Sequence, residues 1–336
     1  MGMMKRIFLA GLCASFITGA CAAQAFRVYA IDVEGGKATL YVSPSGQSML
    51  VDAGYAGNKN RDAERIAAAA KAAGVKQIDY LVITHYHGDH VGGVPQLVAK
   101  MPVRNFVDHG ASFEATKPGG VYDDYVAARA KGKHIEVKAG DRIPIDGLDV
   151  QVVTASGKAI KTPLPGAGQP NPLCAAFKPI EVDKGENAHS IGLMITLGKF
   201  RVVDLGDLHW NQEFDLACPN NLLGTVDVYM TTHHAKKTSG APALVHAMRP
   251  KAAIMNNGPT LGASEQAWQT IHESPGPPDI WQLHLAEGND KEHNAPGAFM
   301  ANRGAKDKGY WIKLSAAADG TFTIQNSRNK MTQTYP

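Results

Sequence analysis

The chain has 336 residues, of which 44% are hydrophobic and 19% are charged. This composition is typical of a folded globular protein and excludes a long disordered chain. The formal net charge is +3, and no block of basic residues accompanies it. A surface for long nucleic acid or for an anionic membrane is therefore not expected.

Residues 1–25 read as a secretory signal peptide. Lys5 and Arg6 precede an apolar run, Ile7–Ala20, and a small-x-small cleavage site ends at Ala25. The apolar run is too short to cross a membrane comfortably. We therefore expect a periplasmic or secreted protein with no membrane span after cleavage. Cleavage removes two cations and no acid, which lowers the formal charge from +3 to +1.

The four cysteines divide into two pairs. Cys13 and Cys21 lie in the predicted signal, where acylation of Cys21 would make a lipoprotein, the alternative to cleavage at Ala25. Cys174 and Cys218 remain in an oxidising compartment, where they form either a disulfide or two buried thiols.

Short alternating segments follow the signal and predict strands. They cover residues 26–31, 38–42 and 48–52. An alanine-rich stretch with interspersed charges then predicts a helix over residues 61–73, which Gly74 ends.

The next predicted strand, residues 75–84, leads directly into a group of metal-ligand side chains. His85 and His87 lie two positions apart, so they face the same way on an extended segment, and Asp89 and His90 follow beyond a glycine. Loops at this end of a strand commonly carry ligand sites. Two imidazoles can hold one ion, and a carboxylate with an imidazole a second. Zinc suits these ligands, with manganese or iron possible. The alternative is a merely polar surface loop.

The pattern His-x-His-x-Asp-His after a strand ending in Thr84 resembles the signature of the metallo-β-lactamase superfamily. The resemblance runs from about Val28 to the C-terminus and points to a bacterial branch that includes the competence-protein-like hydrolases. Residues 31–38 resemble the opening strand and turn of that branch, but differ from its commoner Asp-Val-Gly-Gln-Gly-Asp form. The resemblance implies an αββα four-layer sandwich over residues 26–336 and two divalent ions. It also implies that Asp52 steadies the metal loop from behind.

Residues 156–186 are rich in proline and glycine and predict a long irregular insertion. Such a loop is usually functional or mobile. We expect it to lie over or beside the pocket, or to be a solvated excursion. Elsewhere the pattern predicts helices over residues 94–100, 122–131, 241–248 and 263–273.

A hairpin is predicted over residues 191–205. In the resembled superfamily, a histidine ligand of the first ion precedes such a hairpin, and a bridging aspartate follows it in a Gly-Asp step. The resemblance therefore implies that His189 and Asp207 are ligands. Asn187 is a supporting residue or substitute ligand, and Asp204 is a weaker contender for the place of Asp207.

A partial internal repeat predicts the last ligand. Residues 79–85 are echoed by residues 227–233, because both run Asp, four strand-type residues, Thr, His. Two similar halves would bring both strand ends to one edge of a sandwich, so that His233 closes the site opposite His85. The repeat leaves open whether His234 takes this place instead or faces substrate.

Two ions sharing a hydroxide and Asp207 would supply a nucleophile at neutral pH, which Asp89 would orient. His234 and Tyr86 are candidates for protonating the leaving group. The resemblance favours hydrolysis of a small phosphoester or phosphodiester. The alternatives are a lactonase or β-lactamase-type hydrolase and, without enzyme activity, a zinc-binding envelope protein on a degenerate fold.

Overall fold

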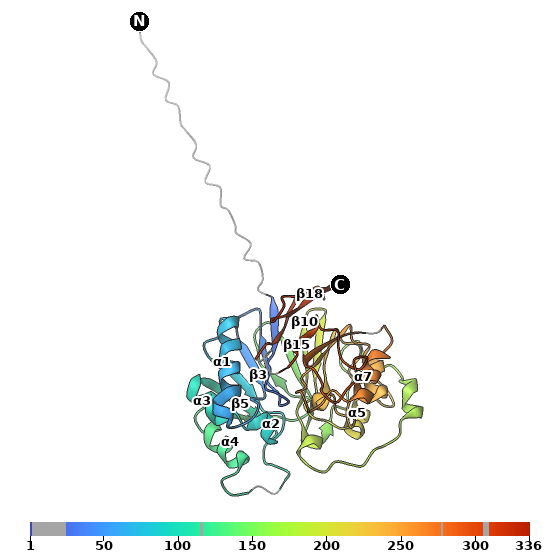
Figure 1. The fold of residues 1–336 in the computed structure, drawn as a ribbon, viewed down its shortest axis with the longest axis horizontal. Helices are drawn as coiled ribbons and strands as arrows, with labels where there is room; N and C mark the ends of the chain where they lie inside the picture. The colour runs from blue at the N-terminus through green and yellow to red at the C-terminus, as the bar shows by residue number, and fades with distance from the viewer. Residues whose placement is uncertain (2–24, 115–116, 277, 305–308) are drawn as a thin grey trace.

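The computed structural model describes the chain except for residues 2–24, 115–116, 277 and 305–308. The body of the predicted signal peptide, including Cys21, lies outside the described residues. The described residues form two β-sheets packed face to face between two layers of helices (Figure 1). This αββα sandwich confirms the predicted fold class.

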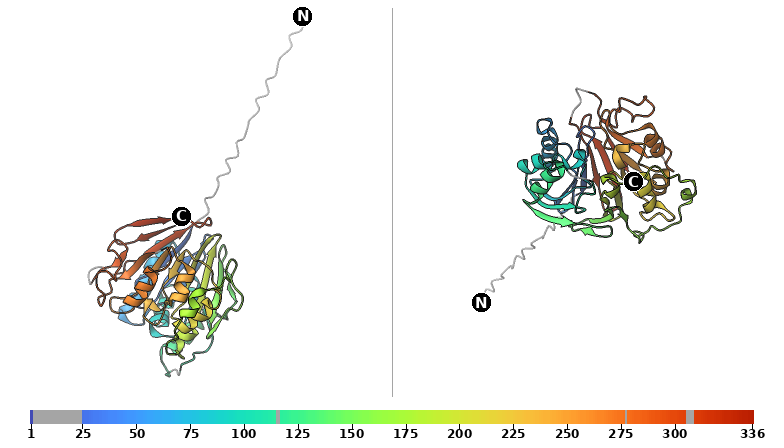
Figure 2. Two further views of the ribbon diagram at one scale, coloured as in Figure 1. Left: turned by 90° about the vertical axis from the view of Figure 1, so that its right-hand side faces the viewer. Right: turned by 90° about the horizontal axis from the view of Figure 1, so that it is seen from below.

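The first sheet contains the N-terminal strands together with the C-terminal ones. Its members are β1 (Phe26–Ala30), β2 (Thr39–Val42), β3 (Ser48–Val51), β4 (Ile78–Val82), β5 (Val103–Asp108), β6 (Lys133–Glu136), β16 (Ile312–Ala316), β17 (Phe322–Asn326) and β18 (Thr332–Tyr335). They lie in the order β18-β17-β16-β1-β2-β3-β4-β5-β6. β1 pairs with β16, which brings the C-terminal strands beside the start of the fold (Figure 2). β3 to β6 run parallel.

The second sheet is built from the middle of the chain. Its members are β7 (Arg142–Ile143), β8 (Asp149–Ala155), β9 (Lys158–Ala159), β10 (Gly192–Leu197), β11 (Phe200–Asp204), β12 (Val228–Met230), β13 (Ala252–Met255), β14 (Asp279–His284) and β15 (Met300–Asn302). The order is β15-β14-β13-β12-β11-β10-β8-β7, with β9 paired to β8. β11 to β15 run parallel.

The helices lie on the outer faces of the two sheets (Figure 1). The first sheet is covered by α1 (Arg61–Ala73), α3 (Val94–Lys100) and α4 (Val121–Arg129), and the second by α5 (Trp210–Ala217), α6 (Pro242–Met248) and α7 (Glu265–His272). The short α2 (Gly88–Val91) follows β4, and single 3₁₀ turns are η1 (Asn58–Asn60), η2 (Pro172–Ala176), η3 (Glu186–His189) and η4 (Thr232–Ala235). Within the described ranges, no helix is long and apolar enough to cross a membrane.

α1 shows why these segments fold as they do. Its apolar residues recur three or four positions apart, so Ile66, Ala69, Ala70 and Ala73 are buried on one face. Gly74 ends the helix with a φ of 74°, a left-handed conformation that glycine adopts without steric cost. The predicted bounds of this helix are therefore the observed ones.

The register of the sandwich brings four strand ends to one edge. β3 and β4 are parallel neighbours in the first sheet, and β11 and β12 are parallel neighbours in the second. Because parallel strands end on the same side, the segments after them meet between the sheets. The fold thereby places Asp52, the loop after β4, Asp207 and the turn after β12 close together.

One buried carboxyl on α5 gives the fold a pH dependence. Glu213 is fully buried and accepts hydrogen bonds from the backbone amides of Gly240 (2.8 Å) and Ala241 (2.7 Å). Burial outweighs these bonds and raises the pKa of Glu213 to about 7. The folded protein therefore keeps this proton longer than the unfolded chain does, so stability falls as the pH rises from about 4.5 to about 7.

We expect Glu213→Gln to remove this part of the pH dependence. Its size is about 3 kcal/mol, because each unit of pKa shift corresponds to ~1.4 kcal/mol. The measurement is the free energy of urea unfolding of wild type and variant at several pH values across that window. Parallel curves for the two proteins would contradict the assignment.

Candidate metal centre

Four side chains, three of them buried and one partly exposed, converge at the edge described above. Asp89 and His90 belong to α2 behind β4, Asp207 follows β11, and His234 lies in η4 behind β12. One ligand atom of each lies within 4.8 Å of those of the other three. His90, Asp207 and His234 are at most 1% exposed. We call these four residues the cluster.

The carboxylate of Asp207 is the centre of the cluster. Its Oδ2 lies 3.2 Å from His90 Nε2 and 3.3 Å from His234 Nε2. Asp89 Oδ2 completes the group at 3.4 Å from His234 Nε2 and 3.7 Å from His90 Nε2. Asp207 Oδ1 is also buried and has no hydrogen-bond partner among the described residues. A buried oxygen of this kind is costly unless a cation or donor satisfies it.

The hydrogen bonds behind the two imidazoles fix which nitrogens face the cluster. His90 Nδ1 lies 2.7 Å from Asp52 Oδ2, and His234 Nδ1 lies 3.2 Å from the carbonyl oxygen of Asn256. Both partners accept, so each Nδ1 carries a proton, and each ring turns a lone pair inward at Nε2 once a bound cation has displaced the second proton. The two Nε2 atoms are 3.2 Å apart. Two lone pairs and two carboxylates at this separation fit a divalent cation between them.

The charges around the cluster favour positive charge there. Burial alone would lower the pKa of His90, but the carboxylates of Asp207, Asp52 and Asp89 outweigh it and raise that pKa well above its usual value. Burial likewise opposes ionisation of Asp207, yet the neighbouring histidines His90, His234 and His233 hold its pKa well below the usual range. The carboxylates are therefore charged at neutral pH, as metal binding requires.

A second pair of nitrogens faces a neighbouring position. His85 Nε2 lies 3.1 Å from His87 Nδ1 and 3.9 Å from Asp207 Oδ2. Thr84 Oγ1 donates to Asp52 and therefore accepts from His85 Nδ1 at 3.1 Å. His87 Nε2 lies 3.2 Å from Glu114 Oε1, a carboxylate oxygen that accepts. The proton of the His87 ring is therefore on Nε2, and its Nδ1 carries none. The two facing nitrogens are again acceptors.

Asp52 takes the place behind the loop that the resemblance implies. Its Oδ1 accepts from the amide of Thr84 at 2.8 Å, and its Oδ2 accepts from the hydroxyl of the same residue and contacts His90. One carboxylate thus fixes the end of β4 and the tautomer of a cluster histidine. Such supporting contacts orient metal ligands in proteins.

Two histidines proposed from the sequence as ligands, His233 and His189, lie outside the cluster. The geometry favours His234, not His233, for the place opposite His85, because His234 is in the cluster. The His189 ring stacks on Phe113 at 3.6 Å, and its Nδ1 lies 2.7 Å from the Gly185 carbonyl; it contributes no atom to the cluster.

Tyr86 also points elsewhere. Its hydroxyl donates to the carbonyl of Gly110, and its ring packs against His109 and Tyr122. Burial raises the pKa of this hydroxyl further above its ordinary value. The Tyr86 hydroxyl is therefore engaged by Gly110, and its role as a proton donor to a leaving group stays a prediction.

Two acidic residues that support the site were missed in the sequence. Glu186 is buried and accepts from the amides of Tyr86 (3.1 Å) and Phe113 (2.7 Å), so it ties the metal loop to the loop after β5. Burial opposes its charge, but His109, the Phe113 amide and the Ser112 hydroxyl lower its pKa to about 2. Glu114, which contacts His87, accepts from the Glu186 amide at 2.9 Å. Both lie outside any local motif, so only the folded chain reveals them.

The insertion, residues 156–186, borders a cavity beside the cluster. This cavity of about 730 Å³ is lined by Ile180 and Val182 of the insertion and by His209 and Trp210 at the start of α5, among others. The His209 ring stacks on that of His233, with centroids 4.9 Å apart. The cavity therefore adjoins the cluster on the side of His233.

The insertion is held at two points, by a disulfide and by the side chain of Asn211. Cys174 and Cys218 form a disulfide, which settles the alternatives left open for them. The side chain of Asn211 accepts from the Ile180 amide (3.2 Å) and donates to its carbonyl (2.9 Å). These contacts hold parts of the insertion against α5 and against Cys218, the residue that follows it.

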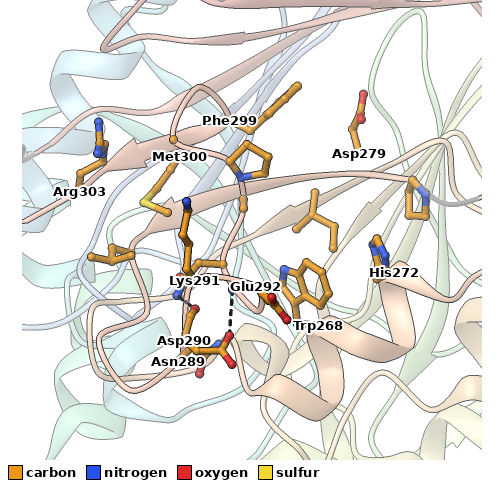
Figure 3. Close-up of a pocket in the computed structure, with 17 residues that line it drawn as sticks. Trp268, His272, Asp279, Asn289, Asp290, Lys291, Glu292, Phe299, Met300 and Arg303 are labelled. Carbon is orange, nitrogen blue, oxygen red and sulfur yellow. Dashed lines mark hydrogen bonds between the residues drawn. The ribbon is translucent and has the colours of Figure 1, made fainter.

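A separate cavity of about 820 Å³ lies beyond α7 (Figure 3). Trp268 and His272 of α7 form one wall, and Phe299, Met300 and Arg303 line it further along the chain. None of its lining residues belongs to the cluster.

Parts of this chain are similar in sequence to a protein-family model and to known proteins. Residues 31–169 match a family model described as the metallo-beta-lactamase superfamily. ComE operon protein 3 of Bacillus subtilis (strain 168) is 28% identical over 190 residues, which are 56% of this chain and 21% of that protein. A hydroxyacylglutathione hydrolase of Rhodopseudomonas palustris (strain HaA2) is 31% identical over 99 residues, 30% of this chain and 32% of that protein. A ribonuclease Z of Alkaliphilus oremlandii (strain OhILAs) is 36% identical over 63 residues, 19% of this chain and 18% of that protein. The chain thus spans a third or less of the length of each of these relatives.

Proposed function

We propose that the chain is a metal-dependent hydrolase of the metallo-beta-lactamase superfamily with two divalent ions, most simply zinc, because residues 31–169 match that family model and the chain is similar to ComE operon protein 3. The observation that carries this proposal is the convergence of acceptor atoms, with His90 Nε2, His234 Nε2 and the carboxylates of Asp89 and Asp207 all facing one point. Acceptors alone do not satisfy one another, so the arrangement calls for a cation.

Each ion would have its own histidines and share Asp207. His90, His234 and Asp89 would hold one. His85 and His87 would hold the other, with Asn187 as a further ligand. The Oδ1 atom of Asn187 is buried without a hydrogen-bond partner among the described residues, which supports Asn187 over His189. Bound ions would supply Lewis acidity and a hydroxide nucleophile at neutral pH.

The chain's own residues would position the reaction. Asp89 is the least buried member of the cluster, with an 18% exposed side chain, so it faces the space that water and substrate enter. Asp52, Glu114 and the Asn256 carbonyl hold the histidine tautomers that the site needs. His233 lies at the edge of the cluster, with its Nε2 3.5 Å from Asp207 Oδ2. In this proposal it contacts the leaving group of the substrate.

The substrate is proposed to be a small phosphoester or phosphodiester. The similarity to a ribonuclease Z supports phosphodiester chemistry at this kind of site. The similarity to a hydroxyacylglutathione hydrolase favours a thioester as the second candidate. We further propose that the protein acts in the periplasm or outside the cell, because a disulfide such as Cys174–Cys218 persists in oxidising compartments.

Hydrolysis by zinc-loaded protein, with Asp89→Ala as the variant, tests the proposal. We expect the wild type to cleave bis(4-nitrophenyl) phosphate and the variant to lose at least about 100-fold in kcat/KM, because a group that positions the reacting water is removed. Circular dichroism would show that the variant is folded. No hydrolysis by the zinc-loaded wild type would overturn the enzyme proposal and favour a zinc-binding role, and equal hydrolysis by the two proteins would remove Asp89 from the reaction.

A further inference from the structure

We infer that Lys236, together with His233, forms an anion-binding edge beside the cluster and selects substrates whose group under attack is negatively charged. This inference rests on the proposed function and decides between its two substrate candidates. Lys236 follows η4, is only partly exposed, and lies on the same turn that delivers His234 to the cluster.

The Lys236 ammonium is separated from the central carboxylate by one imidazole. Its Nζ lies 3.1 Å from His233 Nε2, and that nitrogen lies 3.5 Å from Asp207 Oδ2. Ser239 Oγ donates to the Leu208 carbonyl and so accepts from His233 Nδ1 at 3.3 Å. His233 Nε2 is therefore an acceptor, and the ammonium donates to it.

The backbone separates the roles of the two adjacent histidines. His233, His234 and Ala235 have φ angles of 51°, 55° and 60°, a run of left-handed residues that side chains rarely adopt. Such conformations persist only where the surroundings hold them, and they gather at functional sites. Here they turn His234 into the cluster and leave His233 at its edge, facing Lys236.

The chemistry of an ammonium fits a charged substrate at this place. Lys236 uses one of its three N–H donors on His233. A phosphodiester carries a negative charge on the group that is attacked, and an ammonium binds such oxygens through charge-assisted hydrogen bonds. The carbonyl of a lactone or thioester carries no such charge. The edge therefore favours the phosphoester.

The test compares Lys236→Gln with Lys131→Gln in the zinc-loaded protein. Lys131 has the same charge, is exposed, and belongs neither to the cluster nor to the cavity beside it, so it serves as the matched control. The probes are anionic bis(4-nitrophenyl) phosphate and neutral 4-nitrophenyl butanoate. For the anionic probe, Lys236→Gln should lower kcat/KM by about 10- to 100-fold, the usual effect of a lost hydrogen bond to a charged group. For the neutral probe, and for both probes in Lys131→Gln, kcat/KM should stay within about threefold.

Calorimetric titration with inorganic phosphate adds a readout that needs no turnover. Lys236→Gln should bind phosphate more weakly than wild type, with equal zinc content. An unchanged kcat/KM for the anionic probe, or an equal loss on both probes, would overturn the inference and leave the hydrolase proposal standing. If the wild type cleaves neither probe, the hydrolase proposal fails, and unchanged phosphate affinity in the variant would overturn the anion-binding edge as well.

Discussion

Replacing Lys37 by methionine is expected to lower the free energy of unfolding by about 3–5 kcal/mol, the cost of breaking a buried ion pair from one side. Lys37 is 1% exposed, and its ammonium is paired with the carboxylate of Asp204, which also accepts from the hydroxyl of Tyr41 at 2.9 Å. Burial opposes the charge of Lys37, but Asp204 and Asp52 outweigh it and raise the lysine pKa. The variant would strand the Asp204 charge in the interior.

Urea unfolding of the variant measures this cost. Lys131→Met is the matched control, because Lys131 is exposed and its loss should change stability by less than about 0.5 kcal/mol. The double variant Lys37→Met, Asp204→Leu should recover much of the loss, since neither charge remains. A Lys37→Met protein as stable as wild type would mean that the pair does not hold the sheets together. This pairing also explains why Asp204, the weaker contender in the sequence, is not in the cluster.

Asp207→Asn is expected to lower zinc affinity by at least about 100-fold, and kcat/KM with it. Loss of a residue that only supports a metal ligand typically lowers metal affinity by ~10–100-fold. The loss should be larger here because Asp207 is the carboxylate nearest to both cluster imidazoles. The asparagine keeps the size of the side chain but removes the charge that holds His90 and His234 around it.

Zinc affinity is measured by competition with a chromophoric chelator. Asp215→Asn, an exposed carboxylate on α5, is the control and should bind zinc as wild type does. If Asp207→Asn binds zinc with wild-type affinity and stoichiometry, Asp207 does not lie between the ions.

The metal loop could be predicted from the sequence because its ligand residues lie close together in the chain. A strand, a turn at Gly88 and the spacing of His85, His87, Asp89 and His90 place their side chains without reference to distant residues. Short alternating segments also predicted β1, β2 and β3 of the first sheet, and the pattern predicted the hairpin of β10 and β11 in the second. The repeat located the turn after β12 correctly, because parallel strands must end at the same edge.

The choice between neighbours could not be made from the pattern. A repeat that matches His233 to His85 assumes equivalent backbone, whereas the left-handed run from His233 to Ala235 turns the next histidine inward. His189 fits a motif, but its ring stacks on Phe113, a contact across 76 positions that no local rule anticipates. α5 was not predicted either, because its burial depends on packing against α6.

We propose that two ions bind between the sheets, and the metal content per chain measures their number. Protein purified without chelators should hold about two zinc ions, and His234→Ala should hold about one. His233→Ala and His189→Ala should each keep two, because the structure leaves both rings outside the cluster. One ion or none in the wild type, or loss of an ion in His189→Ala, would contradict this account.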